Sequence, residues 1–218
     1  MTVEVAVRTV PPVPTAVVVA ATTWAESPTR RPAALTWMCS GCCSGTVAPI
    51  TRLVDPADAQ ALASLLAGNR EFLAPWEPER DKEFYTAVVQ RKFIEGQLAE
   101  HAVGRNLPHV ILDANGEIIG RVTISNIVRG AFLSGNLGYW LGQQATGHGY
   151  ATRAVTEIKR IAFTELGMHR LEAGTLVHNV RSQRVLERNG FARYGLAPRL
   201  IKIAGRWQDH VMYQILNE

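Results

Sequence analysis

The pattern of hydrophobic and polar residues changes near residue 50. Residues 1–49 contain six prolines and runs of Val, Ala, Ser and Thr, and neither a helical nor a strand period persists in them. We expect this part to be a low-complexity, disordered extension, or the product of a start codon assigned too early. From Thr51 the periodicity sharpens, so residues 50–218 are predicted to form one folded domain.

Helical signals dominate the first part of this domain. At residues 55–67, Asp55 suits a helix cap, Pro56 suits the first helical position, and apolar residues recur on one face. A short helix or turn is expected at 69–76. A long amphipathic helix is predicted over 81–100. Its apolar positions include Phe84, Val88, Phe93 and Leu98.

Strand signals dominate the rest. Alternation is clear from Arg121 on, and Asn115-Gly116 is a strong hairpin turn. Apolar residues from Ala151 to Ala162 fall at helical spacing, and Gly167 is placed to end that helix. The expected strands are 51–54, 109–113, 117–127, 137–142, 171–177, 201–204 and 207–216, with another helix at 182–189. This mixture predicts an α+β domain around one mostly antiparallel sheet.

The stretch Gln144–Ala151 joins the strand at 137–142 to the next helix. Its glycines, Gly147 and Gly149, let a ligand approach the backbone, and the first N–H groups of a helix attract anions. No Lys-Ser/Thr follows as in Walker A loops, and the three glycines of dinucleotide loops are absent. On the residues alone, a phosphate loop and an ordinary tight turn remain equally plausible.

Composition narrows the function classes. The chain has 218 residues, with 47% hydrophobic and 19% charged residues and a formal net charge of +4. Without a Lys/Arg run, this charge gives no strong case for nucleic acid but suits an anionic cofactor. Cys39, Cys42 and Cys43 lack the further ligands of a zinc site, so no metal is expected. No apolar run is long enough for a membrane helix, and we expect a cytoplasmic protein.

Four segments resemble one enzyme family. Gln144-x-x-Gly147-x-Gly149 resembles the Q/R-x-x-G-x-G/A signature of the GCN5-related N-acetyltransferases (GNAT). The segment from Asn179 to Phe191 is similar to N-x-x-S-x-x-x-L-x-x-x-G-F of the ribosomal-protein-alanine N-acetyltransferase branch. Residues 69–78 and 207–210 look like the substrate-side helix and closing strand of that branch. The resemblance runs from about Thr51 to the C-terminus.

The resemblance implies a GNAT fold whose two central strands splay apart to admit acetyl-coenzyme A as co-substrate. The residues that would bind the coenzyme are Leu141, Gln144, Gly147, His148, Gly149, Tyr150, Ala151, Asn179 and Arg184. In the family, the serine matching Ser182 protonates the leaving thiolate. On the residues alone, the alternative for Asn179 is a helix cap or turn residue, and the alternative for Ser182 is a helix cap.

The general base cannot be transferred from the family. Part of the family uses a glutamate before the last strand, but the sequence there is Arg199-Leu200-Ile201-Lys202. Glu172, on the strand leading to Asn179, is a substitute candidate, or else an ion-pair glutamate. His178 is another candidate, because an imidazole can act as a base near neutral pH, but it could equally be an exposed turn residue. Asp209 is expected mainly to order the final hairpin.

The acceptor is expected to be an amine. Phe72, Leu73 and Trp76 are candidates to line its pocket, although a core stripe is the alternative. By resemblance, the acceptor is a protein N-terminus that starts with Ala or Ser. Small-molecule amines or antibiotics remain alternatives, as does a non-catalytic acyl-coenzyme A-binding module. A monomer or a homodimer is expected.

Overall fold

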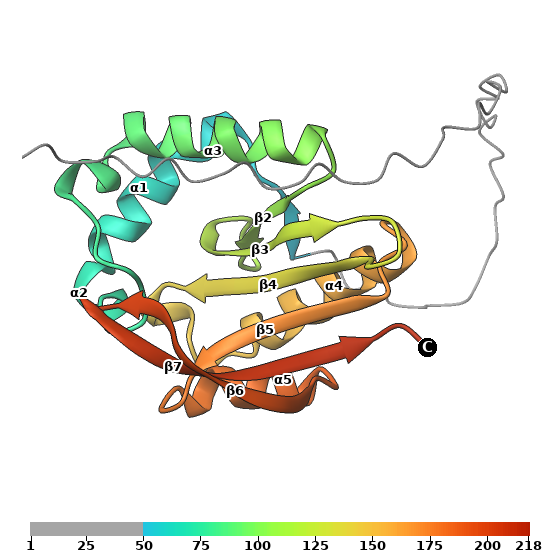
Figure 1. The fold of residues 1–218 in the computed structure, drawn as a ribbon. Helices are drawn as coiled ribbons and strands as arrows, with labels where there is room; N and C mark the ends of the chain where they lie inside the picture. The colour runs from blue at the N-terminus through green and yellow to red at the C-terminus, as the bar shows by residue number, and fades with distance from the viewer. Residues whose placement is uncertain (1–49) are drawn as a thin grey trace, which may run out of the picture. The chain divides into compact units, whose positions relative to one another are not determined.

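The computed structural model describes residues 50–218, which form a single seven-stranded sheet flanked by helices (Figure 1). The predictions for residues 1–49, including the three cysteines, lie outside the described residues. The strands are β1 (Thr51–Leu53), β2 (Leu107–Leu112), β3 (Ile118–Val128), β4 (Ser134–Leu141), β5 (Arg170–Leu176), β6 (Ala192–Ile203) and β7 (Arg206–Leu216). Their spatial order is β1-β2-β3-β4-β5-β7-β6, and only the β4–β5 pair is parallel. The predicted α+β class with a mostly antiparallel sheet is confirmed.

Helices cover both faces of the sheet (Figure 1). The α-helices are α1 (Ala59–Gly68), α2 (Arg70–Leu73), α3 (Ala87–Ala102), α4 (Tyr150–Thr164) and α5 (Val180–Arg188), and the 3₁₀ helices are η1 (Pro56–Asp58), η2 (Lys82–Tyr85) and η3 (Gln143–Ala145). Neighbouring residues of β2 point to opposite faces. Val110 packs in a cluster with Leu62 of α1 and Ile94 of α3, while Ile111 packs in the cluster of α4.

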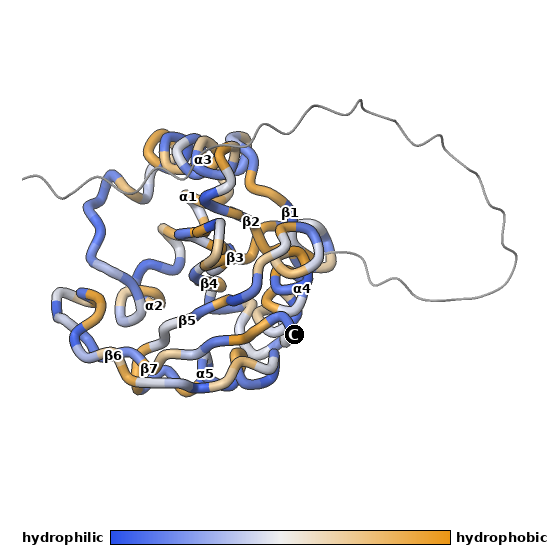
Figure 2. The backbone as a smooth tube through the Cα atoms, turned by 45° about the vertical axis from the view of Figure 1, so that its right-hand side comes forward, coloured by the Kyte–Doolittle hydropathy of each residue, from blue (hydrophilic) through white to orange (hydrophobic). Residues whose placement is uncertain are grey.

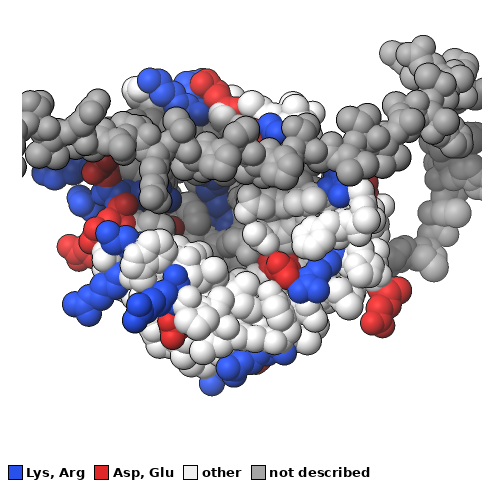
Figure 3. Space-filling model, viewed as in Figure 1, with Lys and Arg blue, Asp and Glu red and all other residues white. Residues whose placement is uncertain are grey.

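The larger core cluster lies between the sheet and α4. The buried residues of α4 are Ala154, Val155, Ile158 and Ala162, which fall on one face as their spacing predicts. Figure 2 shows hydrophobic and hydrophilic positions alternating along these elements. On the face seen in Figure 3, basic and acidic side chains are interspersed. Within residues 50–218, no helix is long and apolar enough to cross a membrane.

Two predicted elements differ in the structure. The helix expected over 81–100 is divided into η2 and α3, because Thr86 adopts an extended conformation and its side chain caps α3 at Val89 N–H. Consequently Val88 is 68% exposed and Gln90 is buried. Strand β6 is much longer than the predicted segment 201–204. The sequence did not reveal the rest of the strand, because most of its residues are exposed and carry no alternating hydrophobic pattern.

The β4–β5 pair opens partway along its length. Only Ser134–Asn136 of β4 pair with β5, at Arg170–Glu172. Beyond these three pairs β4 continues to Leu141 and β5 to Leu176, each bonded only to its outer neighbour, β3 or β7. The expected splayed central strands are therefore present, and two cavities meet at the gap between them.

Candidate functional site

Two cavities converge on the gap between β4 and β5. One, of about 790 Å³, extends towards the loop before α4, and the other, of about 350 Å³, lies over β3 and β4 towards α3. They share the residues Leu73, Trp76, Tyr139, Trp140, Asn179 and Ser182. We call them the larger and the smaller cavity. A group bound in one can thus reach a group bound in the other at Tyr139 and Ser182.

The loop before α4 presents free backbone donors to the larger cavity. Gly149 is the N-cap of α4 with φ +80°, and no side chain caps the helix. Gly147 has φ +85°, and a Cβ atom at either glycine would meet no atom within 4 Å. The first N–H groups of α4, at Tyr150 and Ala151, therefore face open space where an anion can bind.

Helix α5 supplies positive charge to the same cavity. Arg181, Arg184 and Arg188 are exposed, line the larger cavity, and lie three and four residues apart, so they share one face of the helix. This row faces the cavity that the α4 N-terminus also lines. The combination suits a ligand with several phosphates, and only Arg184 was expected from the sequence.

Ser182 lies at the junction of the two cavities. The Asn179 side chain caps α5 by accepting a hydrogen bond from Ser182 N–H at 3.1 Å. The Ser182 hydroxyl is therefore not used as a cap, and its Oγ lies 2.8 Å from the Tyr139 hydroxyl. Tyr139 also donates to the Ser182 carbonyl oxygen at 3.2 Å. Burial raises the pKa of Tyr139 to about 12, so the phenol keeps its proton at neutral pH.

Helix α2 is fastened to the loop after β4. The Asn69 side chain accepts a hydrogen bond from Gln143 N–H at 2.7 Å and donates one to the Leu65 carbonyl at 2.8 Å. Further along, the Trp76 and His178 rings lie 5.5 Å apart. These contacts hold the α2 segment beside both cavities. Leu73 and Trp76, expected at the acceptor pocket, line both cavities, whereas Phe72 lines only the larger one.

Most of the expected coenzyme residues gather at the larger cavity, but three expected site residues do not reach either cavity. Leu141, Gly147, Gly149, Tyr150, Ala151, Asn179 and Arg184 line the larger cavity. Gln144 and His148 are exposed outside it. Glu172 also lies outside both cavities, where it pairs with Arg170 at 2.5 Å and accepts a hydrogen bond from Tyr194 at 3.1 Å. These partners occupy the carboxylate, which corresponds to the ion-pair alternative.

The two other base candidates have different surroundings. His178 lines the larger cavity beside Trp76. Asp209 accepts a hydrogen bond from Arg199 N–H at 2.8 Å, so it orders the β6–β7 hairpin.

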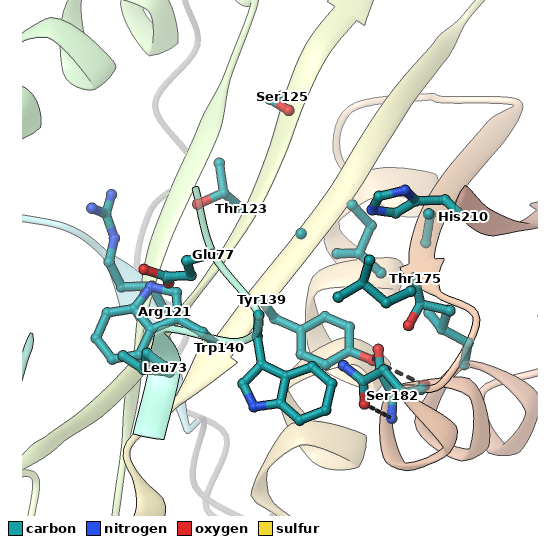
Figure 4. A pocket seen from close by; sticks show the side chains of 18 of the residues that line it. Leu73, Glu77, Arg121, Thr123, Ser125, Tyr139, Trp140, Thr175, Ser182 and His210 are labelled. Atoms are coloured by element: carbon teal, nitrogen blue, oxygen red, sulfur yellow. Dashed lines mark hydrogen bonds between the residues drawn. The ribbon is translucent and has the colours of Figure 1, made fainter. Parts of the chain in front are cut away.

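Sequence reasoning missed the polar residues of the smaller cavity. Glu77, Arg121, Tyr139 and His210 line it, together with Thr123, Ser125 and Thr175 (Figure 4). In Figure 4, Glu77 and Arg121 lie on one side and Thr175, Ser182 and His210 on the other, with Tyr139 between them. The alternation of β3 puts Arg121, Thr123 and Ser125 on one face. The segments 69–78 and 207–210, which resemble the family, contain Glu77 and His210, but the sequence does not show that these side chains meet in one cavity.

The comparisons with known proteins agree with this geometry. The family described as an acetyltransferase (GNAT) domain matches residues 50–192. The chain belongs to the GNAT family. It is 39% identical over 166 residues to the [ribosomal protein uS5]-alanine N-acetyltransferase of Escherichia coli, with 75% of this chain and 84% of that relative covered. A probable N-acetyltransferase of Bacillus subtilis, YjcK, is 35% identical over 167 residues, covering 76% of this chain and 92% of that relative.

Solved structures of acetyltransferases are also similar to this chain. The RimJ of Mycobacterium smegmatis, solved in complex with CoA-disulfide, has 35% identity and a TM-score of 0.74, with 76% of this chain and 80% of that chain covered. This GNAT protein is an acetyl-coenzyme A-dependent N-acetyltransferase. The open space at Gly147 and Gly149, the free N–H groups of α4 and the arginines of α5 fit the phosphates of the coenzyme. No metal-binding group of three or more ligands occurs in the described part of the chain.

Proposed function

We propose that this N-acetyltransferase modifies the N-terminal amine of a protein, with the N-terminal alanine or serine of a ribosomal protein as the leading acceptor. The observation that carries the proposal is the smaller cavity, which meets the larger one beside Ser182. Its volume of about 350 Å³ suits one small residue. The naming of the Escherichia coli relative supports the same acceptor. Such an acceptor also favours a cytoplasmic location.

In this proposal the larger cavity holds acetyl-coenzyme A, which supplies the acetyl thioester. The N–H groups around Gly147–Ala151 bind its diphosphate, and Arg184, with Arg181 and Arg188, contacts phosphate groups. Backbone groups of β4 near Leu141, unpaired on the β5 side, are available to the pantetheine arm. Asn179 serves mainly to cap α5, and it lines both cavities.

Ser182 has the proposed role of general acid. Its hydroxyl donates a proton to the sulfur as the C–S bond breaks, and the Tyr139 hydroxyl then turns its proton from the Ser182 carbonyl oxygen to Ser182 Oγ. The 2.8 Å contact between the two hydroxyls supports this relay, because a serine alone is a poor acid. Phe72, Leu73 and Trp76 border the junction, where they would exclude water from the reacting groups.

The test is release of free thiol from acetyl-coenzyme A with several acceptors. The panel contains peptides that start with Ala or Ser, the same peptides with blocked N-termini, polyamines and aminoglycosides. We expect turnover with the free peptides and none with the blocked ones, even when these contain lysine. Turnover with polyamines or aminoglycosides alone would show that the acceptor is a small molecule. Absence of turnover with every acceptor would favour a binding module.

A further inference from the structure

Glu77 is the one carboxylate among the residues that line the smaller cavity within 50–218. It follows Trp76 and precedes Pro78, in the connection between α2 and η2. The turn of the β6–β7 hairpin holds this connection in place, because Ala204 N–H donates to the Glu77 carbonyl oxygen at 3.2 Å. This bond holds the backbone of Glu77 at the edge of the cavity that its side chain lines.

Unlike Glu172, which is paired with Arg170, Glu77 makes no ion pair within the part of the chain that the structure describes. Burial raises the pKa of Glu77, and the positive charge of Arg80 opposes this only in part. An unpaired, partly buried carboxylate is costly, and it is found mainly where a ligand supplies the missing charge.

The other titratable groups around the cavity do not fill this role. Arg121 comes from β3, bonds to Gln97 of α3 and lies 5.3 Å from the Phe93 ring centroid, and burial lowers its pKa to about 10. It remains a cation at neutral pH and therefore repels an ammonium group. The Tyr139 phenol is neutral, because burial raises its pKa to about 12.

His210 of β7 is the second possible base. Its Nδ1 lies 3.0 Å from the Gln208 carbonyl oxygen, so Nδ1 carries the proton and Nε2 is free to accept one. A neutral imidazole has no negative charge with which to attract an ammonium group. Glu77 supplies both the attraction and the acceptor oxygen, which favours it over His210.

We propose that Glu77 binds the ammonium group of the acceptor and removes its proton. This inference rests on the proposed function and names the residue that defines its substrate class: a cationic primary amine. An α-amino group has a reference pKa of about 8, so at neutral pH most of it must lose a proton before it can react.

The protons balance as follows. The ammonium nitrogen gives one proton to the Glu77 carboxylate, and the neutral nitrogen then forms the C–N bond at the thioester carbonyl carbon. The C–S bond breaks, its electron pair leaves with sulfur, and Ser182 protonates the sulfur. The nitrogen loses its second proton as the amide forms, which restores the Ser182–Tyr139 pair. One proton in total, held by Glu77, is released to solvent.

The test compares Glu77→Gln with Glu79→Gln, a matched control in the same segment whose side chain is exposed and outside both cavities. Thiol release from Ala-starting peptides is measured from pH 5.5 to 9. We expect Glu77→Gln to lower kcat/KM at least about 100-fold at pH 7 and to move the acidic-side fall in rate up to the amine's own pKa of about 8, because only the neutral amine can then react. Glu79→Gln should match the wild type.

Two further measurements separate chemistry from folding. An aminooxyacetyl peptide has a terminal nitrogen that is largely uncharged at neutral pH, so with it the loss in Glu77→Gln should be much smaller. Calorimetry with coenzyme A present should show weaker binding of the Ala-starting peptide to Glu77→Gln. The variant should also melt no lower than the wild type at pH 8. A carboxylate whose pKa is raised in the folded state makes the fold less stable once the pH rises and the group ionises, and glutamine avoids this loss.

Several outcomes would overturn the inference. Wild-type rates and peptide affinity in Glu77→Gln would do so, as would an equal loss with the amine and the aminooxy peptide. If His210→Gln moves the acidic-side fall to the pKa of the amine while Glu77→Gln leaves it where the wild type has it, His210 is the base. A wild-type enzyme that acetylates polyamines but no N-terminal peptide would instead refute the proposed function, and Glu77 would still be tested with the polyamine.

Discussion

Replacing Ser182 with Ala tests the chemistry at the junction of the two cavities. The structure predicts a small effect on stability, because Asn179 rather than Ser182 caps α5, and the cap accepts from a backbone N–H that alanine retains. The Tyr139 hydroxyl loses one partner at 2.8 Å but keeps the carbonyl oxygen of position 182 at 3.2 Å. A single hydrogen bond contributes about 1 kcal/mol, and this residual partner should keep the loss below about 1 kcal/mol.

The expected kinetic effect is much larger. If the hydroxyl protonates the thiolate, removing it should slow the chemical step roughly 10²-fold or more, equivalent to about 2.7 kcal/mol or more in activation free energy. Binding of acetyl-coenzyme A should hardly change, because the thiolate exists only as the C–S bond breaks. The assay is the single-turnover rate at saturating acetyl-coenzyme A, with calorimetry and a melting curve on the same preparation. A rate within about threefold of wild type would refute the assignment of Ser182 as general acid.

Three other substitutions test the surrounding framework. Gly149→Val should abolish coenzyme A binding in calorimetry, because a side chain at φ +80° is strained and would enter the open phosphate site; unchanged affinity would place the phosphates elsewhere. Asn69→Ala should raise the KM for the acceptor and lower the melting temperature, since it frees Gln143 N–H and loosens α2; unchanged values of both would show that the brace is dispensable. Burial, assisted by His101, lowers the pKa of His109 to about 4, so the neutral ring is favoured in the fold and stability falls as the pH drops from about 6.5 to 4. Over that range His109→Gln should remove an acid-side loss of at most about 3 kcal/mol, measured by urea unfolding at each pH; an identical pH dependence in both proteins would contradict this.

The parts of the fold that the sequence predicted are those set by local rules. The stripe of α4 keeps helical spacing because one side faces the sheet throughout its length, and Asn115-Gly116 makes its turn because Gly116 has φ +82°. The division at Thr86 was missed because the segment 81–100 contains no proline or glycine before Gly96. Only the extended conformation of Thr86 separates the two helices there.

The site was predictable where a loop or helix end determines it, and not where distant segments meet. Glycines between a strand and a helix are compatible with an anion site or with a tight turn, and here the resemblance to the GNAT signature favours the anion site. The role of Tyr139 could not be predicted, because the sequence of an apolar strand does not show that the Tyr139 hydroxyl will contact Ser182 of another element. Glu77 was hidden for a similar reason: it lies near two prolines in a segment without a period, and its backbone is held by a hairpin turn more than a hundred residues later.

The start of α5 shows why this distinction matters for catalysis. Asn179 and Ser182 are both good cap residues, three positions apart, and the sequence does not choose between them. If Ser182 were the cap, its oxygen would accept a hydrogen bond from the helix and its direction would be fixed by the backbone. Because Asn179 is the cap, the helix begins one turn earlier and the Ser182 hydroxyl points to Tyr139 at the opening between β4 and β5. The opening exists because the pairing of β4 with β5 ends at Asn136. The residue at which α5 starts and the short length of this strand pair therefore decide together where proton transfer can occur.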